Sequence, residues 1–188
     1  QGISGKMFST LGKNNVNIRA IAQGASEKNI STVIASKDIR KALNSLHNAF
    51  FENQVKHLNL FVVGVGNVGG KLLEQIKTQE VYLLENLQLK INVVGMANSK
   101  KMLFSEEGID LNTWKNDLLD NGIPLDLDAF HETVKSYNLS NSIFVDNTAN
   151  KDIAQLYADY LKESVAVVCC NKIACSSEYE HYLHLKKL

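Results

Sequence analysis

The stretch Leu58-Asn59-Leu60-Phe61-Val62-Val63-Gly64-Val65-Gly66-Asn67-Val68-Gly69-Gly70 decides the fold of the larger part of this 188-residue chain. Its first six residues form an apolar run of strand length, and Leu72, Leu73 and Ile76 follow at helical spacing. A Gly-x-Gly-x-x-Gly motif alone is weak evidence. Here it joins a strand to a helix, which is the context in which the motif binds a dinucleotide. The alternative is a glycine-rich turn with a structural role only.

The glycines of this motif have separate physical roles. Gly64 permits a tight turn, Gly66 lets the backbone approach a pyrophosphate, and Gly69 lets the helix lie close to the strand. The following helix begins at Asn67 and Val68, where free N–H groups and the positive end of the helix dipole favour phosphate. We therefore predict that Gly64, Gly66, Asn67, Val68 and Gly69 bind the cofactor.

Strands alternate with longer helical stretches after this motif. This order predicts an α/β fold of the Rossmann type over residues 58–188, with a parallel sheet and helices on both faces. The only proline, Pro124, lies between two predicted helices and interrupts neither. The expected elements are strands 58–63, 89–96, 142–146 and 165–170 and helices 67–86, 110–120 (short, after a loop), 126–138, 150–163 and 176–187.

The polar loop Asn98-Ser99-Lys100-Lys101 follows the predicted strand 89–96. NAD-specific sites place Asp or Glu here to hold the ribose 2′-OH, and this chain has neither. Amide, hydroxyl and ammonium donors suit the 2′-phosphate of NADP, because that phosphate needs donors and positive charge. We predict NADP as the cofactor, with NAD as the alternative. The competing interpretation is a solvated polar loop.

Two further strands deliver polar residues to the same edge of the predicted sheet. Asp146-Asn147-Thr148 and Asn171-Lys172 follow strands 142–146 and 165–170, and ligands of open α/β folds bind at such carboxyl ends. Asp146 could equally cap the next helix or be solvated. A lysine in the position of Lys172 can polarise a carbonyl or hold a carboxylate, or it can be an ordinary surface residue. The residues alone favour neither interpretation of Lys172.

The first fifty residues show a different order, helix–strand–strand–helix. Apolar spacing predicts a helix from Ile3 that Gly12 ends, a half-buried strand 16–23, a turn 24–29 and a strand 30–35. Asp38 stands at an expected helix N-cap, before a stripe formed by Ile39, Leu43, Leu46 and Phe50. This is the interior of a β-α-β-β-α-β unit, hence a partial ferredoxin-like α+β domain over residues 1–52, with a linker at 53–57. Its missing edge strand implies completion by upstream residues or by another subunit.

Composition excludes several classes of function. Lys+Arg and Asp+Glu both total 20, so the formal net charge is zero and nothing favours nucleic acid as a partner. The apolar runs are too short to cross a membrane, and no signal peptide is visible, so we expect a cytoplasmic protein. Cys169, Cys170 and Cys175 are expected to be small buried hydrophobic residues. The pair His181-x-x-His184 lacks a third ligand, so no metal site is predicted.

Several motifs together resemble a known family. Residues 1–51, through 2–8 and 18–27, resemble the last ACT regulatory domain of aspartokinases. Residues 61–188, through 63–70, 95–101, 145–148 and 171–174, resemble the cofactor domain of homoserine dehydrogenase. Because the ACT-like part comes first, the chain is similar to bifunctional aspartokinase–homoserine dehydrogenases. The departures from the family pattern are Cys169 and Cys170 before the Asn-Lys pair and Asn147 in place of a smaller residue.

This resemblance implies a reaction and a set of residues. The family reduces aspartate semialdehyde to homoserine with NAD(P)H on the route to threonine and methionine. The resemblance also implies that threonine is the effector and that the protein is a homo-oligomer. The chain begins at Gln1 and ends before the substrate domain, so we expect a fragment that binds cofactor but is inactive alone. The rival interpretations are another ACT-linked NAD(P) dehydrogenase and a non-enzymatic amino-acid-sensing module. The residues implied are Asn98, Ser99 and Lys100 near the adenosine ribose, Thr148 at the nicotinamide, Asn171 and the catalytic Lys172 near the substrate, and Asn17, Ile18 and Gln23 at the effector.

Overall fold

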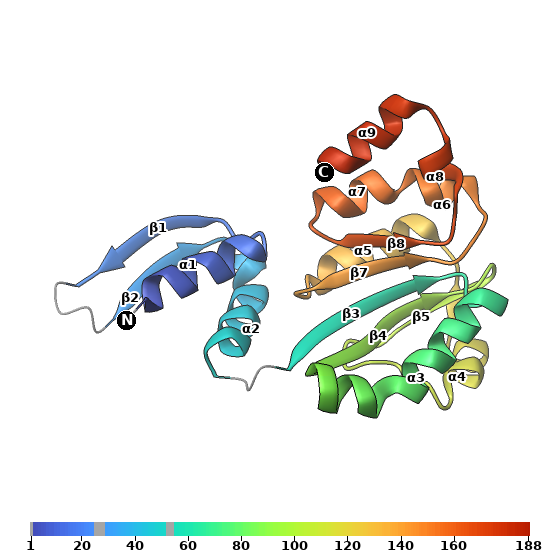
Figure 1. Cartoon of the computed structure of the whole chain (residues 1–188), viewed down its shortest axis with the longest axis horizontal. Helices are drawn as coiled ribbons and strands as arrows, with labels where there is room; N and C mark the ends of the chain where they lie inside the picture. Colours follow the sequence, from blue (N-terminus) through green and yellow to red (C-terminus); the bar gives the residue numbers. More distant parts are fainter. Residues whose placement is uncertain (1, 25–28, 52–54) are drawn as a thin grey trace. The chain divides into compact units, whose positions relative to one another are not determined.

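The computed structural model describes residues 2–24, 29–51 and 55–188 (Figure 1). The chain divides into two compact units. One comprises Gln1–Val55 with Asn138–Ser140, and the other comprises Lys56–Tyr137 with Asn141–Leu188. The predicted turn at 24–29 and the predicted linker at 53–57 lie partly outside the described residues, at 25–28 and 53–54.

The second unit contains a six-stranded sheet with the strand order β6-β5-β4-β3-β7-β8. The four neighbouring strands β4, β3, β7 and β8 are parallel, so the predicted Rossmann-type core is confirmed. The strands are β3 (Lys56–Val63), β4 (Leu89–Ala97), β5 (Lys101–Phe104), β6 (Ile123–Pro124), β7 (Ser142–Asp146) and β8 (Ala166–Cys169).

The antiparallel edge formed by β5 and β6 was not predicted from the sequence. Both strands are too short to show a clear period. The reversal between β4 and β5 depends on Asn98, whose Oδ1 accepts hydrogen bonds from the backbone N–H groups of Lys100 (2.8 Å) and Lys101 (2.7 Å). Pro124 lies in β6, which is at the edge of the sheet. An edge strand tolerates a proline because one side of it needs no backbone N–H donor.

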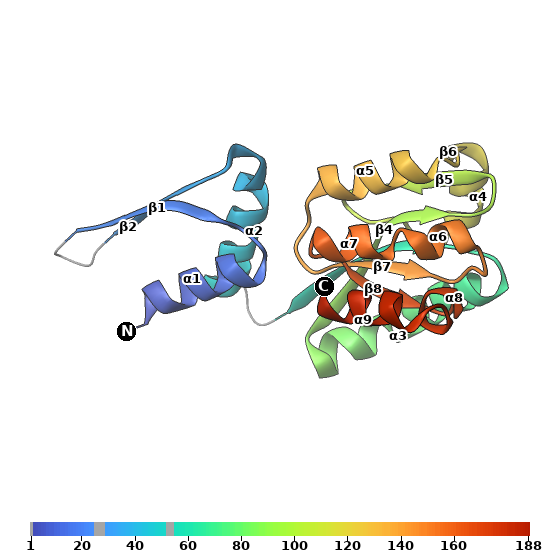
Figure 2. The same ribbon diagram turned by 90° about the horizontal axis from the view of Figure 1, so that it is seen from above.

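Helices cover both faces of this sheet, and Figure 2 shows α3 (Asn67–Leu87) and α5 (Leu127–Tyr137) on opposite sides. Alternating residues of β3 serve the two faces. Leu60 and Val62 belong to a core that includes side chains of α3 and of α4 (Trp114–Asp120). Phe61, between them, packs edge-on against Phe130 of α5, with the ring centroids 6.5 Å apart.

One of the predicted helices is divided into two. The predicted helix 150–163 consists of α6 (Lys151–Gln155) and α7 (Tyr157–Lys162). The predicted helix 176–187 corresponds to α9 (Tyr179–Lys187), and a short helix that was not predicted, α8 (Ile173–Ser176), precedes it across an extended Ser177. The Ser177 hydroxyl donates to the carbonyl of Ala174 (2.9 Å), an example of a serine side chain competing with helix continuation.

The first unit has the predicted helix–strand–strand–helix order. It consists of α1 (Ile3–Lys13), β1 (Ile18–Gln23), β2 (Ile30–Ile34), the 3₁₀ turn η1 (Ser36–Asp38) and α2 (Ile39–Phe50). A small core of Leu11, Val16 and Ala42 holds it together. Gly12 does not end α1, which continues to Lys13. Asp38 occupies the N-cap position of α2 as predicted, although its side chain makes no capping hydrogen bond.

The expectation that strand 16–23 is half-buried holds only at its beginning, where Val16 is 3% exposed and Ile18 is partly buried, whereas Ala20 and Ala22 on the same predicted face are exposed. Ile21 of β1 and Val33 of β2 are 53% and 56% exposed, and the stripe on α2 leaves Leu43 62% exposed. The core formed with α1 and α2 reaches Ile18 and Ile34 at one end of the two-stranded sheet, and no element among the described residues of this unit covers the rest of the sheet.

Candidate dinucleotide-binding site

The loops after the four parallel strands meet at one edge of the sheet. This is the carboxyl edge, and β3 lies between β4 and β7, so the connections diverge on either side of its end. Open α/β sheets bind ligands at such a switch point. Four backbone hydrogen bonds join the loops: Gly64 N–H to Ala97 O (2.8 Å), Val65 N–H to Ala97 O (3.2 Å), Asn147 N–H to Val63 O (2.9 Å) and Cys170 N–H to Asp146 O (2.8 Å).

The glycine-rich turn is crowded at two positions and open at a third. Gly64 has φ +89°, and a Cβ there would lie 2.7 Å from Cγ2 of Thr148. A Cβ on Gly69 would lie 2.1 Å from the carbonyl oxygen of Gly64. A Cβ on Gly66 would meet nothing within 4 Å. The steric roles predicted for Gly64 and Gly69 are thus confirmed, and the position of Gly66 is open.

The N-terminus of α3 suits a bound anion. Its N-cap is Gly66, which has no side chain to cap the first N–H groups, and its first turn contains no acidic residue. Asn67 and Val68 are exposed there, and Val68 keeps 55% of its surface accessible. The helix is 21 residues long, so its dipole adds to the attraction for phosphate.

The loop expected to bind the adenosine ribose forms the tight turn between β4 and β5. Ser99 and Lys100 are exposed at its tip, and Asn98 is partly buried because its Oδ1 holds the turn. The ammonium of Lys101 is not available to a ligand at this loop, because it donates a hydrogen bond to the carbonyl of Leu119 at the end of α4. Lys100 is therefore the cation of this loop that remains accessible.

Asp146 is neither a helix cap nor solvated, in contrast to both interpretations of the sequence. It is wholly buried, and its carboxylate accepts hydrogen bonds from three groups. They are the backbone N–H of Thr148 (2.7 Å), the hydroxyl of Tyr157 (2.6 Å) and Nδ2 of Asn171 (3.0 Å). Burial raises the pKa of Tyr157, and the hydrogen bond to Asp146 raises it further.

The two residues of the Asn171-Lys172 pair have different environments. Asn171 is 4% exposed and its amide is engaged by protein groups, so its side chain serves the architecture of this edge. Lys172 is exposed at the N-cap position of α8 and next to that anchor. The structure thus brings Thr148 and Lys172 to adjacent loops, which Asn171 joins through its contacts with Asp146 and Asn150.

The expectation that all three cysteines are buried is wrong. Cys170 and Cys175 are exposed, and Cys169 is only partly buried; all three are free thiols. Strand β8 is at the sheet edge, so its side chains are incompletely covered. Burial raises the pKa of the Cys169 thiol.

Two residues to which the sequence analysis assigned no role at the site shape this region. A Cβ on Gly95 of β4 would lie 2.8 Å from Phe61 and 2.9 Å from Phe104, so this glycine lets aromatic side chains cross the strand. Nδ2 of Asn147 is buried without a hydrogen-bond partner among the described residues, and it lies 3.1 Å from the Cβ position of Gly69. Asn147 was visible in the sequence only as an amide where the family has a smaller residue.

The residues assigned to the effector are not brought together within the first unit. Asn17 and Ile18 lie at the start of β1, and Gln23 lies at its other end. A six-residue strand spans roughly 17 Å between its ends, which exceeds the length of a small amino acid. Asn17 and Gln23 are exposed, while Ile18 packs against the small core.

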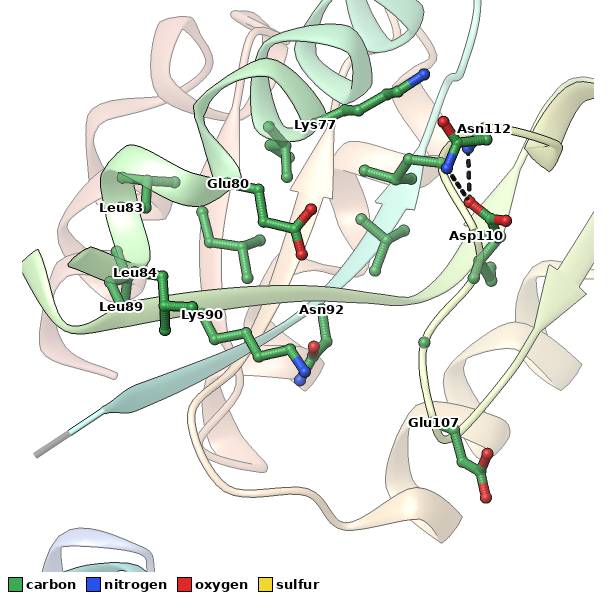
Figure 3. Close-up of a pocket in the computed structure, with 16 residues that line it drawn as sticks. Lys77, Glu80, Leu83, Leu84, Leu89, Lys90, Asn92, Glu107, Asp110 and Asn112 are labelled. Atoms are coloured by element: carbon green, nitrogen blue, oxygen red, sulfur yellow. Dashed lines mark hydrogen bonds between the residues drawn. The ribbon is translucent and has the colours of Figure 1, made fainter. Parts of the chain in front are cut away.

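A cavity of about 380 Å³ lies away from this edge, between the second half of α3, the beginning of β4 and the loop 105–112 (Figure 3). Glu80 of α3 and Lys90 of β4 line it, together with Asp110, whose carboxylate is held by the backbone and side chain of Asn112. Those two hydrogen bonds lower the pKa of Asp110. None of the predicted cofactor residues lines this cavity, so we place the candidate site at the carboxyl edge.

Over residues 2–24, 29–51 and 55–188, no group of three His, Cys, Asp or Glu side chains is placed to hold a metal ion. No helix there combines the length and the apolar character that a membrane crossing requires.

Comparison with known families matches both parts of the chain. Residues 64–188 match the family described as homoserine dehydrogenase, NAD binding domain. The chain belongs to this family. Residues 1–50 match the ACT domain family, which agrees with the resemblance drawn from the motifs.

Curated relatives match over the whole chain. A bifunctional aspartokinase/homoserine dehydrogenase of Haemophilus influenzae is 41% identical over 187 residues, which cover 100% of this chain and 23% of that protein. A chloroplastic bifunctional enzyme of Arabidopsis thaliana is 40% identical over 188 residues, 100% of this chain and 20% of the relative. The chain therefore spans about a fifth of the length of these homoserine dehydrogenase relatives.

Solved structures share the fold over the second unit. A Candida auris protein of unknown function is 25% identical with a TM-score of 0.60, covering 70% of this chain and 35% of that one. Homoserine dehydrogenase from Thermoplasma acidophilum has a TM-score of 0.55 at 18% identity, covering 70% of this chain and 40% of that one. The second likeness supports the fold alone.

Proposed function

We propose that residues 58–188 are the NAD(P)-binding domain of a homoserine dehydrogenase, that 1–52 are part of an ACT regulatory domain and that 53–57 link them. The observation that carries the cofactor assignment is the glycine-rich turn. It is crowded at Gly64 and Gly69 and open at Gly66, at the uncapped start of α3. A turn with a structural role only would not require a glycine at position 66, because a side chain there would meet no protein atom.

The reaction belongs to the longer protein. We infer that it is a bifunctional aspartokinase–homoserine dehydrogenase that reduces aspartate semialdehyde to homoserine for threonine and methionine synthesis. The chain spans about a fifth of such relatives, and residues 64–188 match the NAD binding domain of the family. We expect other parts of the longer protein to complete the site, because cofactor sites are completed at domain interfaces.

The residues at the carboxyl edge have distinct tasks in this proposal. Backbone N–H groups from Gly66 to Val68 bind the pyrophosphate, and Thr148 lines the nicotinamide pocket beside Gly64. The nicotinamide, when bound, supplies the hydride, while the protein provides orientation and electrostatics. Lys172 is accessible, and its ammonium stabilises negative charge on the substrate oxygen.

NADP is the proposed cofactor, with NAD as the alternative. Lys100 and Ser99 are exposed at the β4–β5 turn, and positions 97–101 contain no acidic residue to bind a ribose 2′-OH. A titration with NADPH and with NADH, side by side, tests this preference. Clearly tighter binding of NADH would refute it.

The first unit is proposed to sense threonine through Asn17, Ile18 and Gln23. Because these residues lie at the two ends of β1, one threonine cannot contact all three within a single unit. Apolar side chains of β1 and β2 are exposed, and we expect another subunit of a cytoplasmic homo-oligomer to cover them and to complete the sheet. Threonine binding that requires the oligomer would support this assignment.

The central test is Gly66→Val in this chain. The side chain fills the space proposed for the pyrophosphate, so NADPH binding should fall by at least about 100-fold, a loss of roughly 3 kcal/mol. Gly70→Ala is the matched control, because a Cβ there makes only ordinary contacts at 3.8 Å and 4.0 Å. If Gly66→Val is folded and binds NADPH as tightly as the control, the pyrophosphate site is wrong.

The catalytic assignment is tested separately, by Lys172→Ala in the complete protein. Removal of one electrostatic donor typically lowers the rate by about 10²–10³-fold. A kcat/KM for homoserine within about threefold of the unmodified enzyme would remove Lys172 from the mechanism.

A further inference from the structure

The carboxylate of Asp146 is the most completely buried charged group at the candidate site, with 0% of its surface exposed. A buried carboxylate is costly unless it is hydrogen-bonded. Its Oδ1 accepts from the backbone N–H of Thr148 (2.7 Å), and its Oδ2 accepts from the Tyr157 hydroxyl (2.6 Å) and from Asn171 Nδ2 (3.0 Å). The donors come from the loop after β7, from α7 and from the loop after β8.

The hydrogen bonds continue from Asn171 to both sides of Lys172. Nδ2 of Asn171 also donates to the carbonyl of Asn150 (2.8 Å), which lies in the loop after β7. Oδ1 of Asn171 accepts from the backbone N–H of Ile173 (3.1 Å), the first residue of α8. The backbone of Lys172 is therefore held at the residue before it and at the residue after it.

We propose that Asp146 is a positioning residue that fixes the loop carrying Lys172 relative to the loop carrying Thr148. This inference rests on the proposed function, because it concerns the residues assigned there to substrate and nicotinamide. Both side-chain oxygens of Asp146 must act as hydrogen-bond acceptors for this purpose. In Asp146→Asn, an amide placed at Oδ2 presents a donor to the Asn171 amide, which is also a donor, and that contact becomes repulsive.

The first test measures the coupling between the loops without using activity. Amide hydrogen exchange is followed in this chain for Thr148, which contacts Asp146 directly, and for Ile173, which does so only through Asn171. Asp146→Asn should accelerate exchange at both amides by at least about tenfold, because hydrogen bonds to a charged group are the strong ones. Acceleration at Thr148 alone would overturn the proposal.

Tyr160→Phe is the matched control. Tyr160 belongs to α7, the helix that also contains Tyr157. It is 1% exposed and stacks on Phe144 with the ring centroids 4.0 Å apart. The hydrogen bonds that join Asp146 to its neighbours do not include it. Its substitution should leave exchange at Ile173 unchanged, so equal acceleration in this control would also overturn the proposal.

The second test separates positioning from stability in the complete protein. Misplacement of Lys172 should lower kcat/KM for homoserine by about 10²-fold, while the dissociation constant for NADPH stays within about threefold. A structural role alone would reduce both in proportion to the folded fraction. An unchanged kcat/KM, or a proportional loss of both, overturns the inference.

Tyr157→Phe keeps the outcome decisive if Asp146→Asn does not fold. It removes one donor to Asp146 and retains the Asn171 contact, so a smaller acceleration at Ile173 and a smaller loss of kcat/KM are expected. No change in either would count against the proposal. Failure of the proposed function would give a different result. The unmodified chain would not bind NADPH, while the changes in amide hydrogen exchange at Thr148 and Ile173 would still be observed.

Discussion

Gly69 and Gly70 are neighbours in the first turns of α3, and the structure predicts opposite effects for the same substitution. A Cβ on Gly69 would lie 2.1 Å from the carbonyl oxygen of Gly64 and 3.0 Å from its carbonyl carbon. A Cβ on Gly70 would lie 3.8 Å from the carbonyl oxygen of Val65. Gly69→Ala therefore forces the helix away from the turn, and Gly70→Ala does not.

The magnitudes follow from two opposing effects. Alanine is favoured over glycine within a helix by about 0.8–1 kcal/mol, and this gain applies to both positions. At Gly69, the contact must open from 2.1 Å to the 3.4 Å at which ordinary contacts begin, and the obstacle is backbone. Such overpacking costs about 1–3 kcal/mol or more. We expect Gly69→Ala to be about 1–3 kcal/mol less stable than Gly70→Ala, which corresponds to a net loss of up to about 2 kcal/mol at Gly69 and a gain of up to about 1 kcal/mol at Gly70.

The single tryptophan makes the measurement specific to this unit. Trp114 belongs to the core between α3, α4 and the sheet and is 9% exposed, so its fluorescence reports unfolding of the second unit. Urea unfolding curves of the three proteins give the free energies, and the midpoint temperature should shift by about 2–4 °C per kcal/mol.

The result that would refute this reasoning is a Gly69→Ala variant as stable as Gly70→Ala. The turn would then have room for a side chain at Gly69, and the close approach of α3 to Gly64 would be wrong. A loss of stability equal in both variants would also contradict it, because the argument depends on the difference between the two positions.

Three further predictions follow from the candidate site. Lys100→Ala should weaken NADPH binding by about tenfold and leave NADH binding unchanged, since charge-assisted hydrogen bonds to a phosphate are strong; equal losses for both nucleotides in a fluorescence titration would contradict this role. A thiol reagent at pH 8 should modify Cys170 and Cys175 rapidly and Cys169 slowly, because burial raises the pKa of the Cys169 thiol; three equal rates by mass spectrometry would argue against this burial. The free energy of unfolding should fall as the pH rises above 10.0, because the pKa of Tyr157 is raised by burial and by Asp146, so the unfolded chain releases the proton first. Tyr157→Phe should reduce that slope, and an unchanged slope would show that Tyr157 does not titrate differently in the two states.

The strand–turn–helix unit around the glycines could be predicted from the sequence to within two residues at its ends. The strand begins at Lys56 rather than at residue 58, and the helix ends at Leu87 rather than at residue 86. The apolar run, the glycine spacing and the helical spacing are all local, so they hold whatever surrounds them. The same reasoning predicted the order of the elements in the first unit.

The edge of the sheet and the extent of burial could not be predicted in this way. The strand β5 forms because Asn98 closes a turn and β4 is available as a partner. Most of strand β1 is exposed because the small core of its unit reaches only Ile18, although the sequence of the strand is amphipathic. Both outcomes depend on which surfaces are available, and a periodic pattern does not contain that information.

The site shows the same division. The residue types at the carboxyl edge, and the order in which they occur, are determined by the sequence alone, because parallel strands deliver their carboxyl ends to one edge. Only the tertiary structure decided that Asp146 is buried, since its donors, Tyr157 and Asn171, are 11 and 25 residues away. A carboxylate takes its role from the groups that replace its water, and those groups are chosen by the packing of distant elements.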